Sequence, residues 1–220
     1  MKEALKWPFT WEERRPHLTD RVLFVPDYYS KHEMSFSNWD DPLVFGRKAP
    51  VHVEYCSGNG AWIVNKALTF PDCNWVAVER KLDRVNKIWA KMHAHGIRNL
   101  FIVCGEALTF TTHYVPVETI HTAYINFPDP WPKLRHAKNR LIQESFMTTL
   151  ASKMRPFGEL TFVTDDIAYR DLVLSVVAQP WTSCFQDPSY RTELEGYGGS
   201  YFDTLWRSLG KEIYYLQFRR

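Results

Sequence analysis

The feature that most constrains the fold is an alternation between short apolar runs and segments of helical periodicity. Runs rich in β-branched and aromatic residues predict strands at 51–55, 74–79, 100–104, 122–125 and 158–165. Apolar residues at three- and four-residue spacing predict helices at 61–68, 82–92, 141–154 and 169–176. Two more apolar runs predict strands at 181–185 and 212–218. This order predicts an α/β fold with a doubly wound, mostly parallel seven-stranded sheet.

Two segments lie outside this pattern. Residues 1–45 hold aromatic residues, scattered charge and several prolines, which predicts an irregular N-terminal arm that packs through its aromatic side chains. The polar segment 186–211 carries no predicted element. Since 220 residues with a hydrophobic fraction of 45% suffice for one sizeable core, we expect a single domain over 46–220. Its oligomeric state, monomer or homodimer, stays open.

Composition excludes several classes of protein. The four cysteines, Cys56, Cys73, Cys104 and Cys184, form no CxxC pair, and no cluster of His, Cys and acids has metal-ligand spacing. We therefore expect no metal, no disulfide framework and a reducing, cytoplasmic location. No apolar run has the length of a signal peptide or of a membrane span. A net charge of +2 is too small to indicate a polyanionic partner by itself.

Acidic residues follow five of the predicted strands. In open α/β sheets, ligands bind beyond the carboxyl ends of the strands, at the point where the strand order reverses. Each acid alone is more often a loop or cap residue than a ligand, but the repetition favours a site. The five acids are Glu54, Glu79, Glu106, Asp129 and Asp165.

The segment Glu54-x-x-x-Gly58-x-Gly60 joins a predicted strand to a helix. Such a glycine turn lets the backbone approach a ligand, and Glu79 at the end of the next strand can accept hydrogen bonds from both hydroxyls of a ribose. An acid before the turn repels a pyrophosphate, whereas it suits the cationic amino end of S-adenosyl-L-methionine. The sequence therefore favours this methyl donor as cofactor over a dinucleotide.

The segment Asn126-Phe-Pro-Asp-Pro-Trp-Pro-Lys133, hereafter the Pro loop, ends the fourth predicted strand. Alternate prolines can neither continue a helix nor donate to a sheet, so we expect a stiff, exposed loop that holds Asp129. Cations follow at Lys133, Arg135, Lys138 and Arg140, with His136 among them. This density suits a phosphate backbone, although most charge runs are solvated surface.

The Pro loop and the cations after it resemble the signature of the bacterial tRNA (guanine-N7)-methyltransferase family. The resemblance extends from about Phe45 to Phe218 and implies a Rossmann-like, class I methyltransferase domain. It also implies that S-adenosyl-L-methionine donates a methyl group to guanosine 46 of the tRNA variable loop. The residues implied to bind the donor are Glu54, Gly58, Gly60, Glu79, Glu106 and Asp129, with Asp129 also catalytic. Those implied to contact tRNA or its base are Lys133, Arg135, His136, Lys138, Arg140, Asp165, Ser200 and Asp203.

One departure from the family pattern leaves alternatives open. Cys56 stands where the family usually has the first glycine of the turn. A side chain there narrows the approach to the methionine moiety, which motivates an alternative: a non-catalytic or weakly active RNA-binding protein on the same fold. A small-molecule methyltransferase is a further alternative. Because guanine N7 has no proton to lose, Asp129 is expected to orient the base and stabilise its developing charge rather than to act as an obligatory base.

Overall fold

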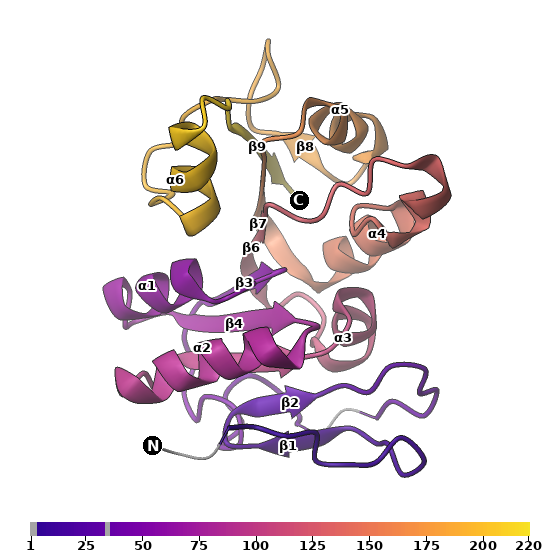
Figure 1. Cartoon of the computed structure of the whole chain (residues 1–220), viewed down its shortest axis with the longest axis vertical. Coiled ribbons are helices and arrows are strands. Elements are labelled where there is room, and N and C mark those ends of the chain that lie inside the picture. The colour runs from indigo at the N-terminus through magenta and orange to yellow at the C-terminus, as the bar shows by residue number, and fades with distance from the viewer. Residues whose placement is uncertain (1–3, 34–35) are drawn as a thin grey trace.

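The computed structural model describes residues 4–33 and 36–220, without the side chain of Leu134. Across this described part, nine strands form one sheet in the order β1-β2-β5-β4-β3-β6-β7-β9-β8 (Figure 1). The strands are β1 (His17–Thr19), β2 (Val22–Phe24), β3 (Val51–Tyr55), β4 (Asn74–Glu79), β5 (Leu100–Cys104), β6 (Ile120–Asn126), β7 (Met154–Thr164), β8 (Thr182–Ser183) and β9 (Tyr214–Arg219). The helices are α1 (Ala61–Thr69), α2 (Leu82–Ala94), α3 (Ala107–Tyr114), the 3-10 helix η1 (Leu134–Asn139), α4 (Glu144–Lys153), α5 (Ile167–Val176) and α6 (Tyr201–Ser208).

All seven predicted strands are present, which confirms the predicted fold class. The strands β2, β5, β4, β3, β6 and β7 pair in parallel, whereas β9 runs antiparallel to both β7 and β8. The chain moves outward from β3 through β4 to β5 and then returns to β6 on the other side of β3. The order therefore reverses between β3 and β6, where a ligand crevice is expected.

Helices cover both faces of the sheet, as the nearly continuous burial of the central strands requires. On one face, α1 and α2 pack Ile63 and Ile88 against the apolar side chains of β4 and β5. On the other face, α3 and α4 contribute Phe110, Phe146 and Leu150 to a second cluster. Both clusters are closed by large aromatic residues, so the high aromatic content of the chain serves mainly the core.

The N-terminal arm differs from the prediction of an irregular segment. Residues Val22–Phe24 are fully buried as β2, and β2 pairs in parallel with β5, so the segment extends the sheet by two strands. The sequence signal was weak because β2 is only three residues long and its partner is far along the chain. The aromatic packing is present: the ring of Trp7 lies 5.7 Å from that of Phe24.

Among the described residues, two α-helices and the 3-10 helix η1 were not predicted. The short α3 begins after Glu106, whose carboxylate accepts hydrogen bonds from the backbone N–H groups of Leu108 and Thr109. The helix α6 lies in the polar segment 186–211 and begins after Ser200, whose hydroxyl accepts from the N–H of Asp203. Both are capped N-termini, and the Ser-x-x-Asp pattern at Ser200 was a signal that could have been used.

Candidate functional site

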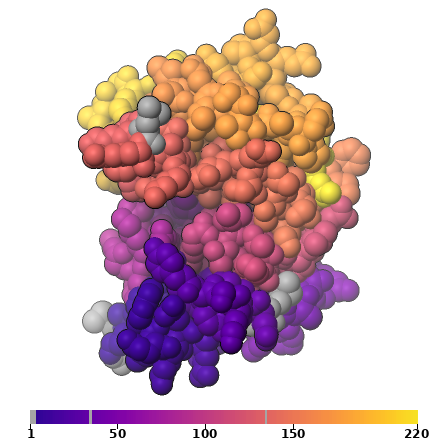
Figure 2. All heavy atoms as spheres, turned by 90° about the vertical axis from the view of Figure 1, so that its right-hand side faces the viewer, coloured from indigo at the N-terminus to yellow at the C-terminus, as the bar shows by residue number. Residues whose placement is uncertain are grey.

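The candidate site lies where the parallel strands end. Glu54 on β3 pairs in register with Ala77 on β4 and Tyr124 on β6, so the carboxyl ends of these strands emerge together. Figure 2 looks onto this edge and shows a recess bordered by the N-terminal segment in indigo and by the segment that follows the Pro loop in red. The predicted site residues therefore face one edge of the molecule.

Glu54 is buried, with 2% of its surface exposed. The amide of Asn126 donates to its Oε1 at 2.7 Å, and Asn126 in turn accepts from the hydroxyl of Tyr197 at 2.9 Å. Among the described residues Oε2 has no hydrogen-bond partner. Burial, partly opposed by the Asn126 bond, raises the pKa of Glu54 to about 8. A buried carboxyl with an unsatisfied oxygen has a strong preference for a cationic or hydrogen-bond-donating ligand.

The turn after β3 is shaped by left-handed backbone. Cys56, Gly58 and Gly60 have φ values of 60°, 55° and 69°. The N–H of Gly58 donates to Glu79 Oε2 at 2.9 Å, and the N–H of Lys81 donates to Oε1 at 2.9 Å. Arg84 Nη1 also lies 3.7 Å from Oε2, so two backbone N–H groups and one ion pair hold Glu79 while the two strand ends are fixed together.

Three of the predicted acids converge on Cys56. Burial raises the pKa of its thiol to about 12, and the charges of Glu79, Asp129 and Glu54 add to that rise. Arg84 opposes them. The turn, the end of β4 and the Pro loop therefore lie within electrostatic reach of one another, and Cys56 lies among the acids rather than outside the site.

The Pro loop leaves the sheet at Asn126 and stays free of regular structure as far as Lys133, as predicted. Its exit uses left-handed backbone at Phe127 (φ 48°) and Trp131 (φ 44°). Arg140 braces it: Nε donates to the carbonyl of Pro130 at 2.9 Å and Nη2 to that of Trp131 at 3.1 Å. Asp129 is exposed at the tip of this braced loop.

The cations after the loop divide into two groups. Lys133, Arg135 and Lys138 are exposed around η1. By contrast, the guanidinium of Arg140 is engaged by the loop carbonyls, which gives this residue a structural role that the sequence did not suggest. The ring of His136 packs edge-on against that of Trp131, with centroids 5.6 Å apart, so His136 also supports the loop.

The outer acids have partners of their own. Both carboxylate oxygens of Glu106 accept hydrogen bonds from the first turn of α3, and Oε2 accepts one more from the hydroxyl of Thr109. Asp165, beyond β7, forms an ion pair with Lys211, whose Nζ also lies 3.9 Å from the ring centroid of Trp206. These two acids line the same edge and, like Glu79 with its two backbone N–H groups and Arg84, are less available to a ligand than Oε2 of Glu54.

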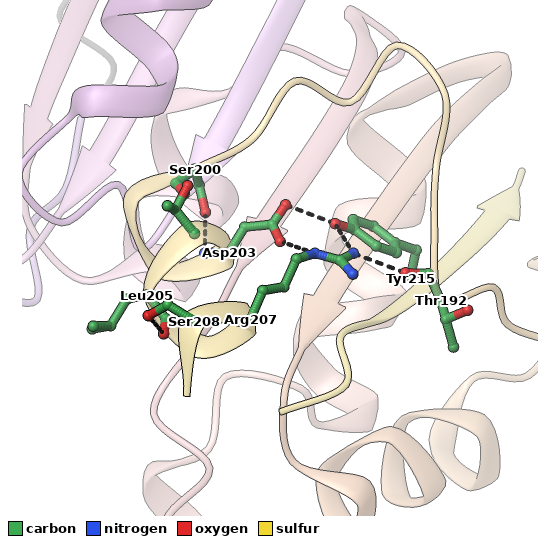
Figure 3. A network of polar contacts seen from close by, with 8 residues as sticks. Thr192, Ser200, Asp203, Leu205, Arg207, Ser208 and Tyr215 are labelled. Atoms are coloured by element: carbon green, nitrogen blue, oxygen red, sulfur yellow. Dashed lines mark hydrogen bonds and ion pairs between the residues drawn. The ribbon is translucent and has the colours of Figure 1, made fainter. Parts of the chain in front are cut away.

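Ser200 and Asp203 are buried and organise α6 (Figure 3). Asp203 Oδ1 pairs with Arg207 Nε at 2.6 Å, and Oδ2 accepts from the hydroxyl of Tyr215 at 2.9 Å. The carboxylate of Asp203 is thus occupied by α6 and β9 in this structure. The side chains between the two buried residues, Tyr201 and Phe202, remain exposed. Phe202 lies 6.0 Å from Phe127 between ring centroids, which brings α6 beside the Pro loop.

The segment before α6 is held on α1. The indole Nε1 of Trp62 donates to the carbonyls of Tyr197 and Gly198, and Lys66 Nζ donates to that of Gly196 at 2.8 Å. With the hydrogen bond from Tyr197 to Asn126, these contacts connect α6 to the acid pocket. A long-range connection of this kind leaves no local sequence signal.

Among the described residues, no three or more His, Cys, Asp and Glu side chains are arranged to hold a metal ion. In the same part of the chain, no helix is long and apolar enough to cross a membrane.

The residues fit S-adenosyl-L-methionine. The unsatisfied buried Oε2 of Glu54 provides an acceptor for its amino group, and Glu79 lies one strand further along, where ribose hydroxyls can donate to it.

Several methyltransferases of known structure share the fold. TrmN from Thermus thermophilus gives a TM-score of 0.57 at 13% identity, over 79% of this chain and 45% of that one. The 16S rRNA methyltransferase KamB gives a TM-score of 0.54 at 17% identity, over 80% of this chain and 89% of that one. Fold and site together define a class I methyltransferase that uses S-adenosyl-L-methionine.

Sequence comparison gives the family. A family model described as "Putative methyltransferase" matches residues 48–216. A tRNA (guanine-N(7)-)-methyltransferase of Chlamydia caviae is 45% identical over 217 residues, which are 98% of this chain and 96% of that protein. One of Geobacter metallireducens is 30% identical over 198 residues, 89% and 93% of the two chains. The chain belongs to the tRNA (guanine-N(7)-)-methyltransferase family, as the Pro loop predicted.

Proposed function

We propose that this protein transfers the methyl group of S-adenosyl-L-methionine to N7 of guanosine 46 in the variable loop of tRNA. The observation that carries the proposal is the buried carboxyl of Glu54 at the end of β3, whose Oε2 has no hydrogen-bond partner among the described residues, beside Glu79 at the end of the adjacent strand β4. This arrangement offers carboxylates to a cationic methyl donor, and the sequence after Gly60 lacks the Lys-Ser/Thr pair of a P-loop. The names of the relatives support tRNA guanine N7 as the target.

In this proposal, each acid at the strand ends binds or borders a different part of the methyl donor. Glu54 receives the amino group of the methionine moiety, since its Oε2 is buried and unpartnered. Glu79 receives the ribose hydroxyls, while the first turn of α3, capped by Glu106, borders the adenine. Gly58 and Gly60 keep the turn close to the donor. When bound, the donor supplies an electrophilic methyl group on a sulfonium.

Asp129 is the proposed catalytic residue. Methyl transfer moves positive charge onto the guanine ring, and a carboxylate held near the ring stabilises that charge. The bracing of the Pro loop by Arg140 fixes where Asp129 lies. Because N7 carries no proton, orientation and charge stabilisation are sufficient roles for this carboxylate.

The proposed tRNA contacts lie on either side of Asp129. Lys133, Arg135 and Lys138 are exposed and suit the phosphate backbone. Asp165, with its ion pair to Lys211, lies on the α6 side. In the proposal, Ser200 and Asp203 act on the base indirectly, by holding the first turn of α6 so that Tyr201 and Phe202 stand beside the Pro loop. Arg140 and His136 shape the loop that the RNA meets.

Titration with S-adenosyl-L-methionine by calorimetry, together with a methylation assay on tRNA, tests the proposal. We expect the donor to bind and the tRNA to be methylated. The double charge reversal Lys133→Glu and Arg135→Glu should leave donor binding unchanged and lower methylation of tRNA at least tenfold, since each lost phosphate contact weakens RNA binding. The control reversal Lys48→Glu, at a side chain that is 90% exposed and lies 3.9 Å from Asp40 on another part of the surface, should do neither.

Two results would contradict the proposal. Absence of donor binding would favour a non-catalytic RNA-binding protein, the role suggested by the Cys56 side chain in the turn. Donor binding with methylation that is indifferent to the charge reversal would favour a substrate smaller than tRNA.

A further inference from the structure

An aromatic pair in the N-terminal segment stands free of the core. Tyr28 is 82% exposed and Trp11 is 58% exposed, and their ring centroids lie 6.2 Å apart in an edge-on arrangement. Single exposed hydrophobic residues are common and need no explanation. Here, however, two large rings that flank β1 and β2 in the sequence are brought together in the open.

Arg14 holds the pair in place. Its guanidinium carbon lies 4.1 Å from the ring centroid of Trp11, Nη1 donates to the carbonyl of Trp11 at 2.6 Å, and Nη2 donates to that of Tyr28 at 3.1 Å. Tyr28 adopts left-handed backbone with φ 55°, which is costly for an aromatic residue. Two backbone bonds, a cation–π contact and a strained residue thus maintain an exposed surface rather than bury it.

The pair is located at the same edge as the methyl-donor site. Because β2 runs parallel to β5, the segment after β2 emerges beside Gly105, where Val25 N–H donates to the Cys104 carbonyl at 2.9 Å. The adjoining Asp27 forms a 2.9 Å ion pair with Arg80, the residue that follows Glu79. In Figure 2 the N-terminal segment borders the recess on the side opposite the chain that follows the Pro loop.

The spacing fits a polynucleotide. Four strand spacings separate β2 from β6, which at about 4.8 Å each places β2 about 19 Å from the strand that leads into the Pro loop. At about 3.4 Å per stacked nucleotide, this corresponds to roughly six nucleotides. Residues that line a small-molecule pocket are enclosed, because the pocket buries most of the ligand's surface. The rings of Trp11 and Tyr28 are instead open to solvent. Exposed rings with an adjacent arginine are instead the means by which proteins stack unpaired bases.

We propose that Trp11, Arg14 and Tyr28 form a second tRNA-docking surface, which stacks unpaired bases on the side of the methyl-donor site opposite the Pro loop. This inference rests on the proposed function and deepens it. Stacking is the main contribution, because the exposed Glu12 and Glu13 beside Arg14 offset part of the positive charge. The surface would orient the tRNA while the cations around η1 hold its backbone.

The test compares tRNA affinity, by filter binding, with affinity for S-adenosyl-L-methionine, by calorimetry. The double variant Trp11→Ala and Tyr28→Ala should bind tRNA about tenfold more weakly, from the loss of base stacking, and bind the donor as wild type does. Tyr28→Phe, which keeps the ring, should retain wild-type tRNA affinity. Phe157→Ala removes an aromatic side chain that is 76% exposed at the start of β7, on the opposite edge, and should change neither affinity.

The outcomes separate this inference from the function it rests on. If the wild-type protein methylates tRNA and the double variant binds tRNA equally well, the docking surface is wrong and the proposed function stands. If the double variant loses affinity for the donor instead, the pair belongs to the donor pocket and the inference fails. If the wild-type protein neither binds nor methylates tRNA, both fail.

Discussion

At the scale of the residue, the site depends on where carboxylates are placed and how far each is already engaged. Glu54 is buried with one oxygen unpartnered, Glu79 is held by two backbone N–H groups, and Asp129 is exposed on a braced loop. Three chemically similar groups therefore have different preferences for a ligand: a cation, a pair of hydroxyls and a ring that gains charge.

The raised pKa of Glu54 predicts that donor binding depends on pH. With a pKa of about 8, Glu54 is mainly protonated at pH 7 and must lose that proton to receive a cationic amino group. We expect donor affinity to rise with pH by up to about tenfold per unit below pH 8 and then to level off, with release of about one proton at pH 7. Calorimetry in buffers of different ionisation enthalpy measures the proton count.

The variant Glu54→Gln is the control for this prediction. It should bind the donor weakly and without the proton release.

The same substitution should alter stability, because the folded pKa of about 8 lies above the ordinary value of 4.5. The folded state then binds more protons between these values, so wild-type stability falls as pH rises from about 4.5 to 8. Glu54→Gln should lack that fall. Donor binding that ignores pH would contradict the assignment of Glu54.

Sequence reasoning was most successful for single acids at strand ends and least successful for what holds them. Glu54 and Glu79 follow local strand signals, and the structure places both at the carboxyl ends of the adjacent strands β3 and β4. Arg140, by contrast, was read as an RNA contact because it belongs to a charge run, whereas its guanidinium braces the Pro loop. A side chain's partner across a turn depends on the path of the loop, which composition does not encode.

At the scale of the element, the sequence predicts what is periodic and misses what is short or stabilised from a distance. The helices α1, α2, α4 and α5 have regular apolar spacing, and the predicted strands are apolar or alternating runs, although only Thr182–Ser183 of the run at 181–185 forms β8. The strand β2 and the helix α6 lack regular apolar spacing: β2 depends on pairing with β5, and α6 on the contacts of Asp203 with Arg207 and Tyr215. Tertiary contacts decide such elements, so local propensity is a weak guide to them.

The start of α1 leaves no room for a side chain at Gly60. A Cβ at Gly60 would lie 2.6 Å from Cγ1 of Ile88, and the residue has φ 69°. Gly60→Ala should therefore destabilise the fold by about 2–4 kcal/mol through steric conflict and backbone strain. Gly96→Ala is the matched control, because Gly96 has φ 61° with no atom within 4 Å of an added Cβ. It should cost only about 1 kcal/mol.

Chemical denaturation of the two variants measures the difference. We expect Gly60→Ala to have the lower midpoint and the weaker donor binding, since α1 and α2 would be pushed apart beside the turn. Equal midpoints for the two alanine variants would show that the close approach of α1 to α2 is not what requires glycine at this position.

At the scale of the whole molecule, the groups that suit the methyl donor lie deeper in the fold than the groups that suit RNA. The acids that suit the methyl donor lie at the ends of β3 and β4, beside the point where the strand order reverses. The exposed groups that suit RNA, namely the cations around η1 and the aromatic pair of the N-terminal segment, border the same edge farther out. The net charge of +2 therefore does not reveal that acids gather at the strand ends and cations around η1.

Methylation of unmodified tRNA by the purified protein, with the product mapped by mass spectrometry of nuclease fragments, tests the central claim most directly. The account predicts a single 7-methylguanosine in the variable loop, at position 46, and a loss of about a hundredfold or more in kcat for Asp129→Asn, because the asparagine keeps the shape but not the charge. A tRNA that remains unmethylated by protein saturated with S-adenosyl-L-methionine, or a methyl group on another atom or nucleotide, would contradict it.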